Sequence, residues 1–221
     1  MIKINPELKG QLVFEIKSWY GRIFLRNRSK IRILNEPVLM DVGAGTNYRE
    51  GWIHVDFFLI RNPFKLHKGK SKKTPEVQMD LRFPFKCTDA QIDGIYSSHT
   101  LEHFSYAEAN QLLKEFFRML KPGGWLRLIV PDLETYIEFY LGKNNDLPYK
   151  SGCEAIASLT QEWGHKSVWD YARLSKQLES QGFSEVKKLE YGLEGTDKRL
   201  IKDLASRKEE SLVIEAQKPH A

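Results

Sequence analysis

The stretch Leu39-Met-Asp41-Val-Gly43-Ala-Gly45-Thr46 begins with apolar residues and ends in a Gly-x-Gly turn, and Ile53-His-Val55-Asp56 follows shortly after it. Each segment is typical of a short buried strand with an acidic residue near its carboxyl end. In a parallel α/β sheet, glycines after one strand let the backbone approach a ligand closely. An acid after the next strand can accept hydrogen bonds from both hydroxyls of a ribose. The pair therefore predicts a nucleoside-binding edge.

The residues after Gly45 favour a nucleoside that carries no phosphate group. A phosphate loop of the Walker type needs Gly-Lys-Ser/Thr, whereas Gly45 is followed by Thr46 and Asn47. A dinucleotide-binding fingerprint needs a third glycine at the position of Tyr48, which disfavours a nicotinamide-dependent dehydrogenase. S-adenosylmethionine fits the remaining pattern best, although two glycines after a strand also mark ordinary turns.

Composition indicates an ordinary globular chain. Of its 221 residues, 41% are hydrophobic and 29% are charged, which is typical of a single domain with a substantial core. The sequence contains no apolar run of about 18 residues and no pattern of a secretory signal. Cys87 and Cys153 have no metal-type spacing and are interpreted as reduced thiols, so we expect a cytoplasmic protein.

The net charge of +5 is concentrated in two basic segments, one between residues 22 and 32 and one at 65–73. Each is interpreted either as solvated surface or as an attraction for an anionic partner. The segment 12–25 combines Trp19 and Phe24 with arginines, so it either packs against the sheet or lies on a membrane face as an amphipathic helix. Peripheral membrane contact through this basic N-terminal segment is thus a candidate. We expect no nucleic-acid partner, and no oligomeric state is predicted.

Strand-like and helix-like segments alternate, which predicts a parallel sheet covered on both faces. Ser105 begins the clearest helix, because apolar residues recur at helical spacing from Ala109 to Leu120, and Pro122 and the following glycines end it. Further helices are expected at 133–141, 153–163 and 168–181, partly as a cap over the substrate, and 195–207 is a helical candidate. Strands are expected at 38–42, 52–56, 76–80, 92–97, 125–130, 185–190 and 211–217.

Several motifs follow one another in a characteristic order. They are Asp41-Val-Gly43-Ala-Gly45, Val55-Asp56, Met79-Asp80-Leu81 with Phe83-Pro-Phe85, Ile92-Asp-Gly-Ile95, Leu101-Glu102-His103, Leu120-Lys-Pro-Gly-Gly124 and Val130-Pro-Asp132. In this order the chain resembles class I S-adenosylmethionine-dependent methyltransferases over roughly residues 38–217. Three further segments resemble a type 11-like group of predicted bacterial methyltransferases associated with surface-polysaccharide pathways. These are Gly51-Trp-Ile53-x-Val55-Asp56, Ser97-Ser98-His99-x-Leu101-Glu102-His103 and Ser211-Leu-Val213-x-Glu215-Ala216.

The resemblance implies an α/β fold: a Rossmann-like, doubly wound sheet of seven strands, mostly parallel with the last strand antiparallel, plus a helical cap. It divides the chain into a helical, basic extension (1–36), a methyltransferase domain (37–217) with a cap insertion (133–182), and a tail (218–221). Only six residues separate Gly45 from Trp52, where the family has a helix of three turns. We therefore expect a helix of two turns or less at this position.

The resemblance also implies S-adenosyl-L-methionine as the cofactor and suggests which residues bind it. The methionine end is expected near the first glycine turn, the ribose near the acid of the second strand, the adenine near the third strand, and the methyl group beside the fourth strand. In that order, the residues are Asp41, Gly43, Ala44 and Gly45; Asp56; Asp80 and Leu81; Ser97 and Ser98. Phe57, next to Asp56, is a further cofactor-binding candidate.

Methyl transfer from a sulfonium requires alignment of the acceptor, and a hydroxyl acceptor also benefits from a general base. His99 is the first candidate for this base, because it follows the fourth strand and an imidazole is available near pH 7. His103 is the second candidate, and Glu102 is expected to orient one of them or to cap a helix. A histidine with a purely structural role is the alternative for His99. By analogy we expect a small-molecule or saccharide acceptor, methylated at oxygen, and cap aromatics that suit sugars: Tyr136, Tyr140, Trp163, His165 and Trp169.

Three other functions stay open. His99-Thr-Leu-Glu102-His103 matches the His-x-x-Glu-His pattern of inverted zinc peptidases, although that motif belongs inside a helix and here it follows a strand. Some O-methyltransferases bind a divalent metal through Glu-x-x-Glu-His. In this chain His99 stands in place of the first Glu, so that alternative uses His99, Glu102 and His103, with His165 as a candidate extra ligand from the cap. The main prediction assigns no metal. A non-catalytic nucleoside-binding protein is the third alternative.

Overall fold

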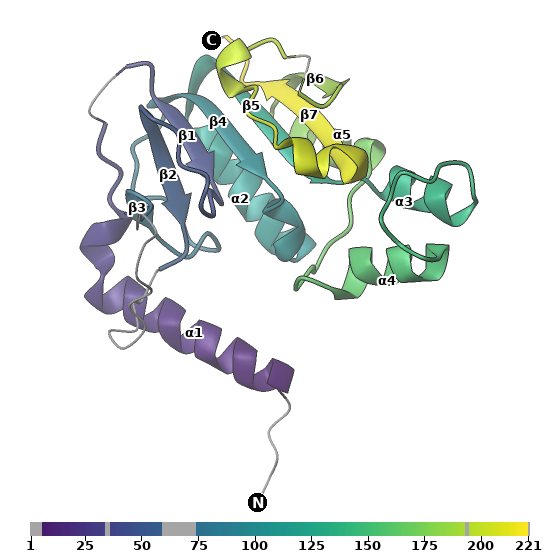
Figure 1. Ribbon diagram of the computed structural model, residues 1–221. Coiled ribbons are helices and arrows are strands. Elements are labelled where there is room, and N and C mark those ends of the chain that lie inside the picture. The colour runs from purple at the N-terminus through teal and green to yellow at the C-terminus, as the bar shows by residue number, and fades with distance from the viewer. Residues whose placement is uncertain (1–5, 34–35, 59–73, 193–194, 221) are drawn as a thin grey trace, which may run out of the picture.

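The structure is a computed structural model that describes residues 6–33, 36–58, 74–192 and 195–220 (Figure 1). Seven strands form one sheet in the order β3-β2-β1-β4-β5-β7-β6. The strands β1 to β5 run parallel to one another, and β7 runs antiparallel to both β5 and β6. The expected seven-stranded α/β fold with an antiparallel last strand is confirmed. The strands are β1 (Leu39–Val42), β2 (Trp52–Asp56), β3 (Val77–Gln78), β4 (Ile92–Ser98), β5 (Leu120–Pro131), β6 (Ser184–Leu189) and β7 (Ser211–Gln217).

Five α-helices accompany the sheet in the described part of the chain. They are α1 (Pro6–Phe24), α2 (Tyr106–Met119), α3 (Leu133–Tyr140), α4 (Gly152–Gln161) and α5 (Tyr171–Ser180). Short 3-10 helices are η1 (Arg26–Ser29), η2 (Leu101–His103), η3 (Lys198–Leu200) and η4 (Ala205–Glu210), the last two within or beside the segment expected to be helical. Among the helices in these ranges, none is both long and apolar enough to cross a membrane. The basic stretch 65–73 lies outside the described residues.

The main core lies between the sheet and the helices α2 and α5. A capping box starts α2, because Ser105 accepts from the backbone of Glu108 while the Glu108 side chain accepts from Ser105. The apolar face of α2, including Leu112 and Phe116, is fully buried, and Leu174 of α5 joins the same cluster. The opposite face of the sheet is packed by a smaller cluster: Leu39, Trp52, Tyr96, Ile129, Tyr191, Leu200 and Val213.

Two local predictions are wrong. Within the described segment 36–58, no helix forms between Gly45 and Trp52. The connection runs through turns instead, with Asn47 donating to the carbonyl of Ala44, because six residues are too few for a helix and its two reversals. Strand β5 begins at Leu120 rather than at 125, because Leu120 already pairs with Ile92 and the sharp turn at Gly123 (φ +79°) is accommodated within the strand.

Helix α1 lies beside the edge at which β1, β2 and β3 end (Figure 1). Its Ser18 donates to Asp80, its Phe14 stacks on Phe57 with ring centroids 4.4 Å apart, and Arg82 bridges Glu15 to Asp80. One face of the predicted N-terminal helix therefore packs on the domain, as one of the two interpretations expected. Its other residues remain exposed, among them Leu8, Leu12, Ile16, Trp19, Ile23 and Phe24.

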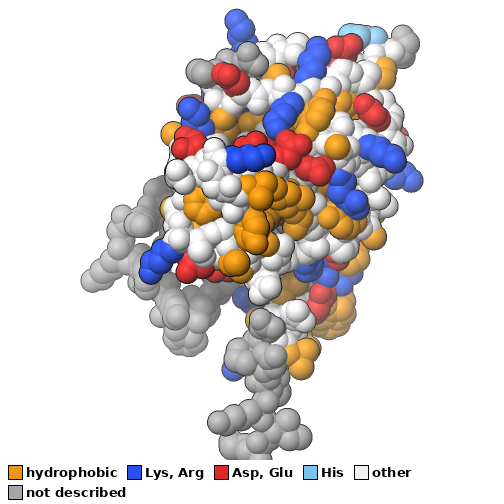
Figure 2. Space-filling view, turned by 90° about the vertical axis from the view of Figure 1, so that its right-hand side faces the viewer, with side chains coloured by type: hydrophobic (Ala, Val, Ile, Leu, Met, Phe, Trp, Pro, Cys, Tyr) orange, Lys and Arg blue, Asp and Glu red, His pale blue; other side chains and the backbone are white. Residues whose placement is uncertain are grey.

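Within the predicted cap insertion 133–182, helices α3 and α4 project from the sheet as a small separate layer, whereas α5 packs on the sheet (Figure 1). The layer has its own core of Tyr136, Leu147, Ala155 and Leu159. Figure 2 shows this side of the molecule, where hydrophobic side chains gather among charged ones. The exposed apolar residues of α3 and its end are Ile137, Tyr140 and Leu141, so Tyr140 points to solvent.

Candidate functional site

The parallel pairing of β1 with β2 places the two predicted strand ends side by side, since Val42 lies opposite Val55. One oxygen of the Asp56 carboxylate, Oδ2, accepts a hydrogen bond of 2.7 Å from the backbone N–H of Gly45. The other, Oδ1, accepts from the backbone N–H of Phe57 at 2.6 Å. The glycine turn and the acid are thus hydrogen-bonded to each other and form one cradle at this edge of the sheet.

The structure explains why residue 43 is a glycine, which the sequence alone did not reveal. Its φ is +78°, and a Cβ placed there would lie 2.0 Å from Oγ1 of Thr100, in the loop after β4. Thr100 in turn donates to the carbonyl of Ser98. Ser97 is buried and donates to the carbonyl of Val42 at 2.8 Å, so it ties β4 to β1. These contacts hold the ends of the two central strands together.

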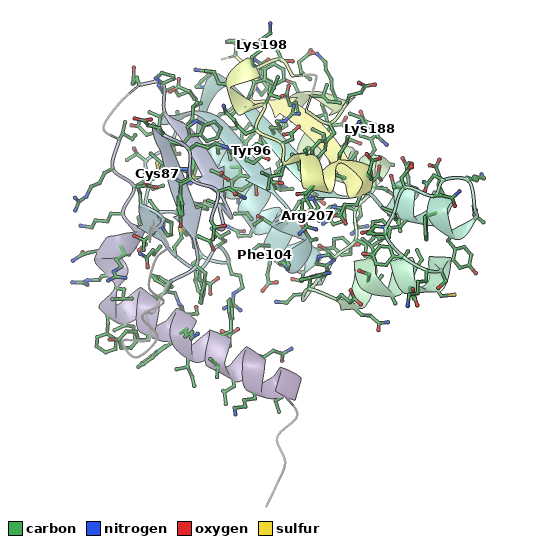
Figure 3. All side chains as sticks on the ribbon, in the orientation of Figure 1. Cys87, Tyr96, Phe104, Lys188, Lys198 and Arg207 are labelled. Atoms are coloured by element: carbon green, nitrogen blue, oxygen red, sulfur yellow. The ribbon has the colours of Figure 1, made fainter. Side chains whose placement is uncertain are left out.

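Asp41 is buried and has a partner that the sequence did not single out. Its carboxylate accepts from Arg49 at 3.0 Å, and the same guanidinium donates to the carbonyl of Lys202 and lies over the ring of Tyr96, in the middle of the sheet (Figure 3). Burial raises the pKa of Asp41 to about 7 although the Arg49 charge opposes the shift. The turn residue Arg49 is therefore the group that satisfies Asp41.

Asp80 and Phe57 lie under helix α1. The Asp80 carboxylate is buried, which raises its pKa, but hydrogen bonds from Arg82 and Ser18 outweigh burial and hold the pKa below the ordinary value. Phe14 covers the ring of Phe57. Asp80, predicted to flank the adenine, and Phe57, another predicted cofactor-binding residue, are thus both in contact with the N-terminal helix.

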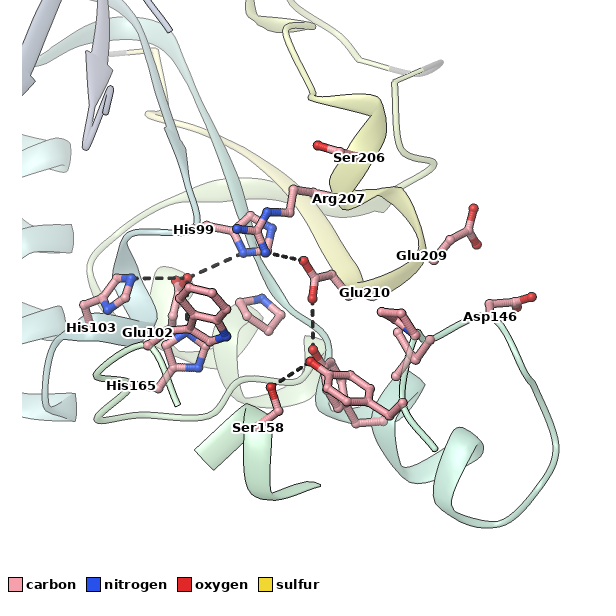
Figure 4. Close-up of a pocket in the computed structure, with 16 residues that line it drawn as sticks. His99, Glu102, His103, Asp146, Ser158, His165, Ser206, Arg207, Glu209 and Glu210 are labelled. Carbon is pink, nitrogen blue, oxygen red and sulfur yellow. Dashed lines mark hydrogen bonds and ion pairs between the residues drawn. The ribbon is translucent and has the colours of Figure 1, made fainter. Parts of the chain in front are cut away.

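The predicted catalytic residues gather at the end of β4 (Figure 4). His99 has an unusual backbone φ of +48°, and its Nε2 lies 2.9 Å from the hydroxyl of Ser211. That hydroxyl donates its single proton to the carbonyl of Arg207, so Nε2 of His99 carries the hydrogen and donates to Ser211. The lone pair of the His99 imidazole is therefore on Nδ1, which faces Glu102 at 3.6 Å.

Glu102 is the centre of this group. Its side chain is buried in η2, and its Oε1 lies 3.9 Å from Nε2 of His103 and 4.0 Å from Nε2 of His165 (Figure 4). The backbone carbonyl of Glu102 accepts from Lys166 and Ser167, which draws the segment after α4 over the motif. Burial raises the pKa of Glu102 to about 8 and lowers the pKa of His99 to about 4. The imidazole of His99 is consequently neutral at pH 7.

A cavity of about 740 Å³ lies between this group and the cap. Its far wall includes Glu210, which accepts hydrogen bonds from Tyr136 at 3.0 Å and from Arg207 at 2.6 Å. Of the predicted cap aromatics, Tyr136, Trp163 and His165 line the cavity, whereas Trp169 belongs to the main core. Sequence reasoning missed four charged wall residues, because they come from loops and a 3-10 helix without periodic pattern: Asp146, Arg207, Glu209 and Glu210.

Comparisons with known proteins agree with this architecture. Residues 58–128 match the family model described as "Methyltransferase domain". No curated protein sequence matches the chain significantly. Among solved structures, a chain of the complex between the Haloferax volcanii Trm112 methyltransferase activator and a methyltransferase is similar at 14% identity and a TM-score of 0.50, covering 94% of this chain and 93% of that chain.

A second solved structure, a SAM-dependent methyltransferase from Archaeoglobus fulgidus, is similar at 18% identity and a TM-score of 0.48, covering 93% of this chain and 94% of that one. At 14% identity, the likeness to the first of these structures shows the fold alone. The family match supplies the activity and, with it, S-adenosyl-L-methionine as the methyl donor. The chain accordingly carries the domain of an S-adenosylmethionine-dependent methyltransferase.

Proposed function

We propose that this methyltransferase transfers the methyl group to an oxygen of a small, saccharide-like acceptor that binds in the cavity beneath the cap. The observation that carries the proposal is the cavity of about 740 Å³ whose wall contains His99, directly after the end of β4. Since β4 pairs with β1, this wall is adjacent to the glycine turn that follows β1. Ligands of open α/β sheets bind at such carboxyl ends.

We assign the cofactor to the cradle of the two strand ends. A carboxylate offers about four acceptor positions, and backbone N–H groups occupy two of those on Asp56. The other two are available for the two hydroxyls of a ribose. The remaining proposed contacts follow the strand order: the methionine end at Asp41, Gly43, Ala44 and Gly45, the adenine at Phe57, Asp80 and Leu81, and the methyl path at Ser97 and Ser98.

His99 is the proposed base. The methyl group of a sulfonium is already activated, so alignment of the acceptor supplies most of the acceleration, about 7–11 kcal/mol in well-oriented reactions. A positioned base adds about 10²–10⁴-fold for a hydroxyl acceptor. The neutral imidazole of His99 presents the lone pair of Nδ1, while Ser211 fixes Nε2 as the donor. Glu102 and His103 are the other two members of the proposed catalytic group, and both line the cavity beside His99.

The cap supports a polyhydroxylated acceptor. The cavity combines the aromatic faces of Tyr136, Tyr149 and Trp163 with the hydrogen-bonding groups of Glu210 and Asp146. Aromatic faces pack on the C–H faces of sugar rings, and carboxylates accept from their hydroxyls. An acceptor linked to surface-polysaccharide synthesis is consistent with this wall.

The test is a transfer assay with methyl-labelled S-adenosylmethionine against sets of nucleotide sugars and glycans. We expect labelled ether carbon on a sugar hydroxyl and a loss of about 10²–10⁴-fold in turnover for His99→Gln, with unchanged binding of S-adenosylhomocysteine. His220→Ala, at an exposed histidine near the C-terminus, is the matched control. Label on nitrogen or carbon, or full activity of His99→Gln, would contradict the proposal.

We also propose that the exposed face of α1 contacts an anionic membrane surface peripherally. Leu12, Ile16, Trp19 and Ile23 recur at helical spacing and expose between 48% and 56% of their area. Arg22 and Arg26 lie next to this face, which suits anionic lipid headgroups. Sedimentation with anionic vesicles, but not with neutral ones, is expected for the wild type, and Trp19→Ser with Ile23→Ser should weaken it. Equal recovery from both vesicle types would refute the contact.

A further inference from the structure

The buried carboxylate of Glu102 is surrounded by nitrogen atoms without being hydrogen-bonded to any of them. Only 1% of Glu102 is exposed, and neither of its oxygens has a hydrogen-bond partner among the described residues. Its Oε1 lies 3.6 Å from Nδ1 of His99, 3.9 Å from Nε2 of His103 and 4.0 Å from Nε2 of His165. A buried polar group that lacks a partner costs about 1–3 kcal/mol, and more when it is charged. The arrangement therefore requires a missing partner.

The protonation of two imidazoles identifies what kind of partner is missing. Nδ1 of His165 lies 2.9 Å from the carbonyl of Leu159, and a carbonyl only accepts, so Nδ1 carries the hydrogen. Its Nε2 consequently presents a lone pair toward Glu102. The contact of His99 with Ser211 likewise leaves the lone pair of that ring on Nδ1. Two imidazole lone pairs and a carboxylate thus converge, and all three are acceptors.

A single proton on Glu102 does not satisfy this set. The nearest imidazole nitrogen is 3.6 Å away, which is too long for a hydrogen bond, and a proton serves only one neighbour. A cation between the groups serves all of them. We infer that Glu102, His103 and His165 bind a divalent transition-metal ion on the wall of the cap cavity. One ligand atom from each of these residues lies within 4.8 Å of the others.

The geometry fits such an ion after small side-chain movements. Metal–nitrogen and metal–oxygen bonds are about 2.0–2.2 Å long, so ligand atoms of a tetrahedral site lie about 3.3–3.6 Å apart. The separations of 3.9 and 4.0 Å from Oε1 to the two Nε2 atoms need to shorten by about half an ångström. The bond from Nδ1 of His165 to Leu159 is the outer hydrogen bond that fixes a metal-binding histidine. Two imidazole nitrogens with one carboxylate favour Zn²⁺ over Mn²⁺ and Mg²⁺, which prefer oxygen ligands.

Three protein ligands leave a position for the acceptor. All three residues line the cavity, so this position opens toward the bound substrate, and His99 stands beside it. The role of the ion, unlike the site itself, rests on the proposed function. In the proposed reaction, the ion would hold the acceptor hydroxyl and lower its pKa, and Nδ1 of His99 would receive the proton of that hydroxyl. The proposal also gives His165 of the cap a function that its position in the sequence does not reveal.

The experiment measures metal binding by the full chain without any turnover. Protein is stripped with a chelator, titrated with Zn²⁺, Mn²⁺ or Mg²⁺ in a calorimeter, and its metal content is determined after dialysis. We expect one Zn²⁺ per chain, weaker binding of Mn²⁺ and Mg²⁺, and at least about 100-fold weaker Zn²⁺ binding for Glu102→Gln and His165→Ala. His220→Ala is the matched histidine control and should bind as the wild type does. Circular dichroism confirms that each variant is folded.

The outcomes separate this inference from the proposed function. Stoichiometric binding that is lost in both variants supports the site. Failure of the folded wild type to bind either transition metal, or equal binding by Glu102→Gln, overturns it. Titration of the same stripped protein with S-adenosylhomocysteine gives the second readout. Cofactor binding without metal binding refutes the metal site alone, whereas metal binding without cofactor binding refutes the proposed use of the cavity.

Discussion

Replacement of Asp56 by alanine tests the cofactor cradle most sharply. The carboxylate has about four acceptor positions, and the backbone N–H groups of Gly45 and Phe57 occupy two of them. The other two positions are the ones that we assign to the ribose hydroxyls. A hydrogen bond to a charged group contributes about 1.5–3 kcal/mol, so the loss of two costs about 3–6 kcal/mol. Since about 1.4 kcal/mol corresponds to a tenfold change, the affinity for S-adenosylhomocysteine should fall by about 10²–10⁴-fold.

Calorimetric titration with S-adenosylhomocysteine measures this effect. Asp56→Asn keeps one acceptor oxygen and should bind with an affinity between those of the wild type and Asp56→Ala. Glu50→Ala, an exposed acid in the same turn, is the matched control and should bind normally. Thermal unfolding shows whether loss of the bond to Gly45 has loosened the turn itself. The reasoning is refuted if a folded Asp56→Ala protein binds within about threefold of the wild type.

Three further predictions concern the frame of the site. Arg127→Met leaves Asp203 and Glu215 buried without their cation and should lower the free energy of unfolding by about 3–5 kcal/mol, measured with denaturant; an unchanged midpoint would contradict this. Gly43→Ala should destabilise more than Gly45→Ala, because only at Gly43 would the Cβ meet Thr100, and equal losses would refute that contact. The pKa of Asp80 is held below its ordinary value, so its stabilisation is full above the unfolded pKa of about 3.9 and is lost as the pH falls below it. Asp80→Asn should remove this acid-dependent part from unfolding curves, and identical pH profiles would argue against it.

The sheet could be predicted because its signals are local. Apolar runs of strand length ended by glycine or an acid define β1 and β2, and their parallel pairing brings Gly45 to Asp56. Helix α2 followed from the spacing of its buried residues and from Ser105. By contrast, the expected helix after Gly45 came from the family pattern, and the chain is too short for it there. Arg49 donates to Asp41, but no pattern in the sequence distinguishes it from the other arginines.

The candidate site was predictable only in part. The motif His99 to His103 is contiguous, so a turn after β4 keeps its members close. His165 lies close to Glu102 because the backbone N–H groups of Lys166 and Ser167 donate to the carbonyl of Glu102 and hold the cap segment over η2. No periodic pattern in the sequence predicts this contact. Arg207 and Glu210 enter the cavity from η4, just before β7, for the same reason. Long-range packing, which sequence periodicity does not encode, therefore decides which residues line the cavity.

A crystal structure of the chain with S-adenosylhomocysteine tests the central claim most directly. The account predicts ribose hydroxyls within hydrogen-bond distance of both oxygens of Asp56, and a sulfur atom that faces the cap cavity beside His99. A ribose bound away from Asp56, or a sulfur atom separated from that cavity by the sheet, would contradict it.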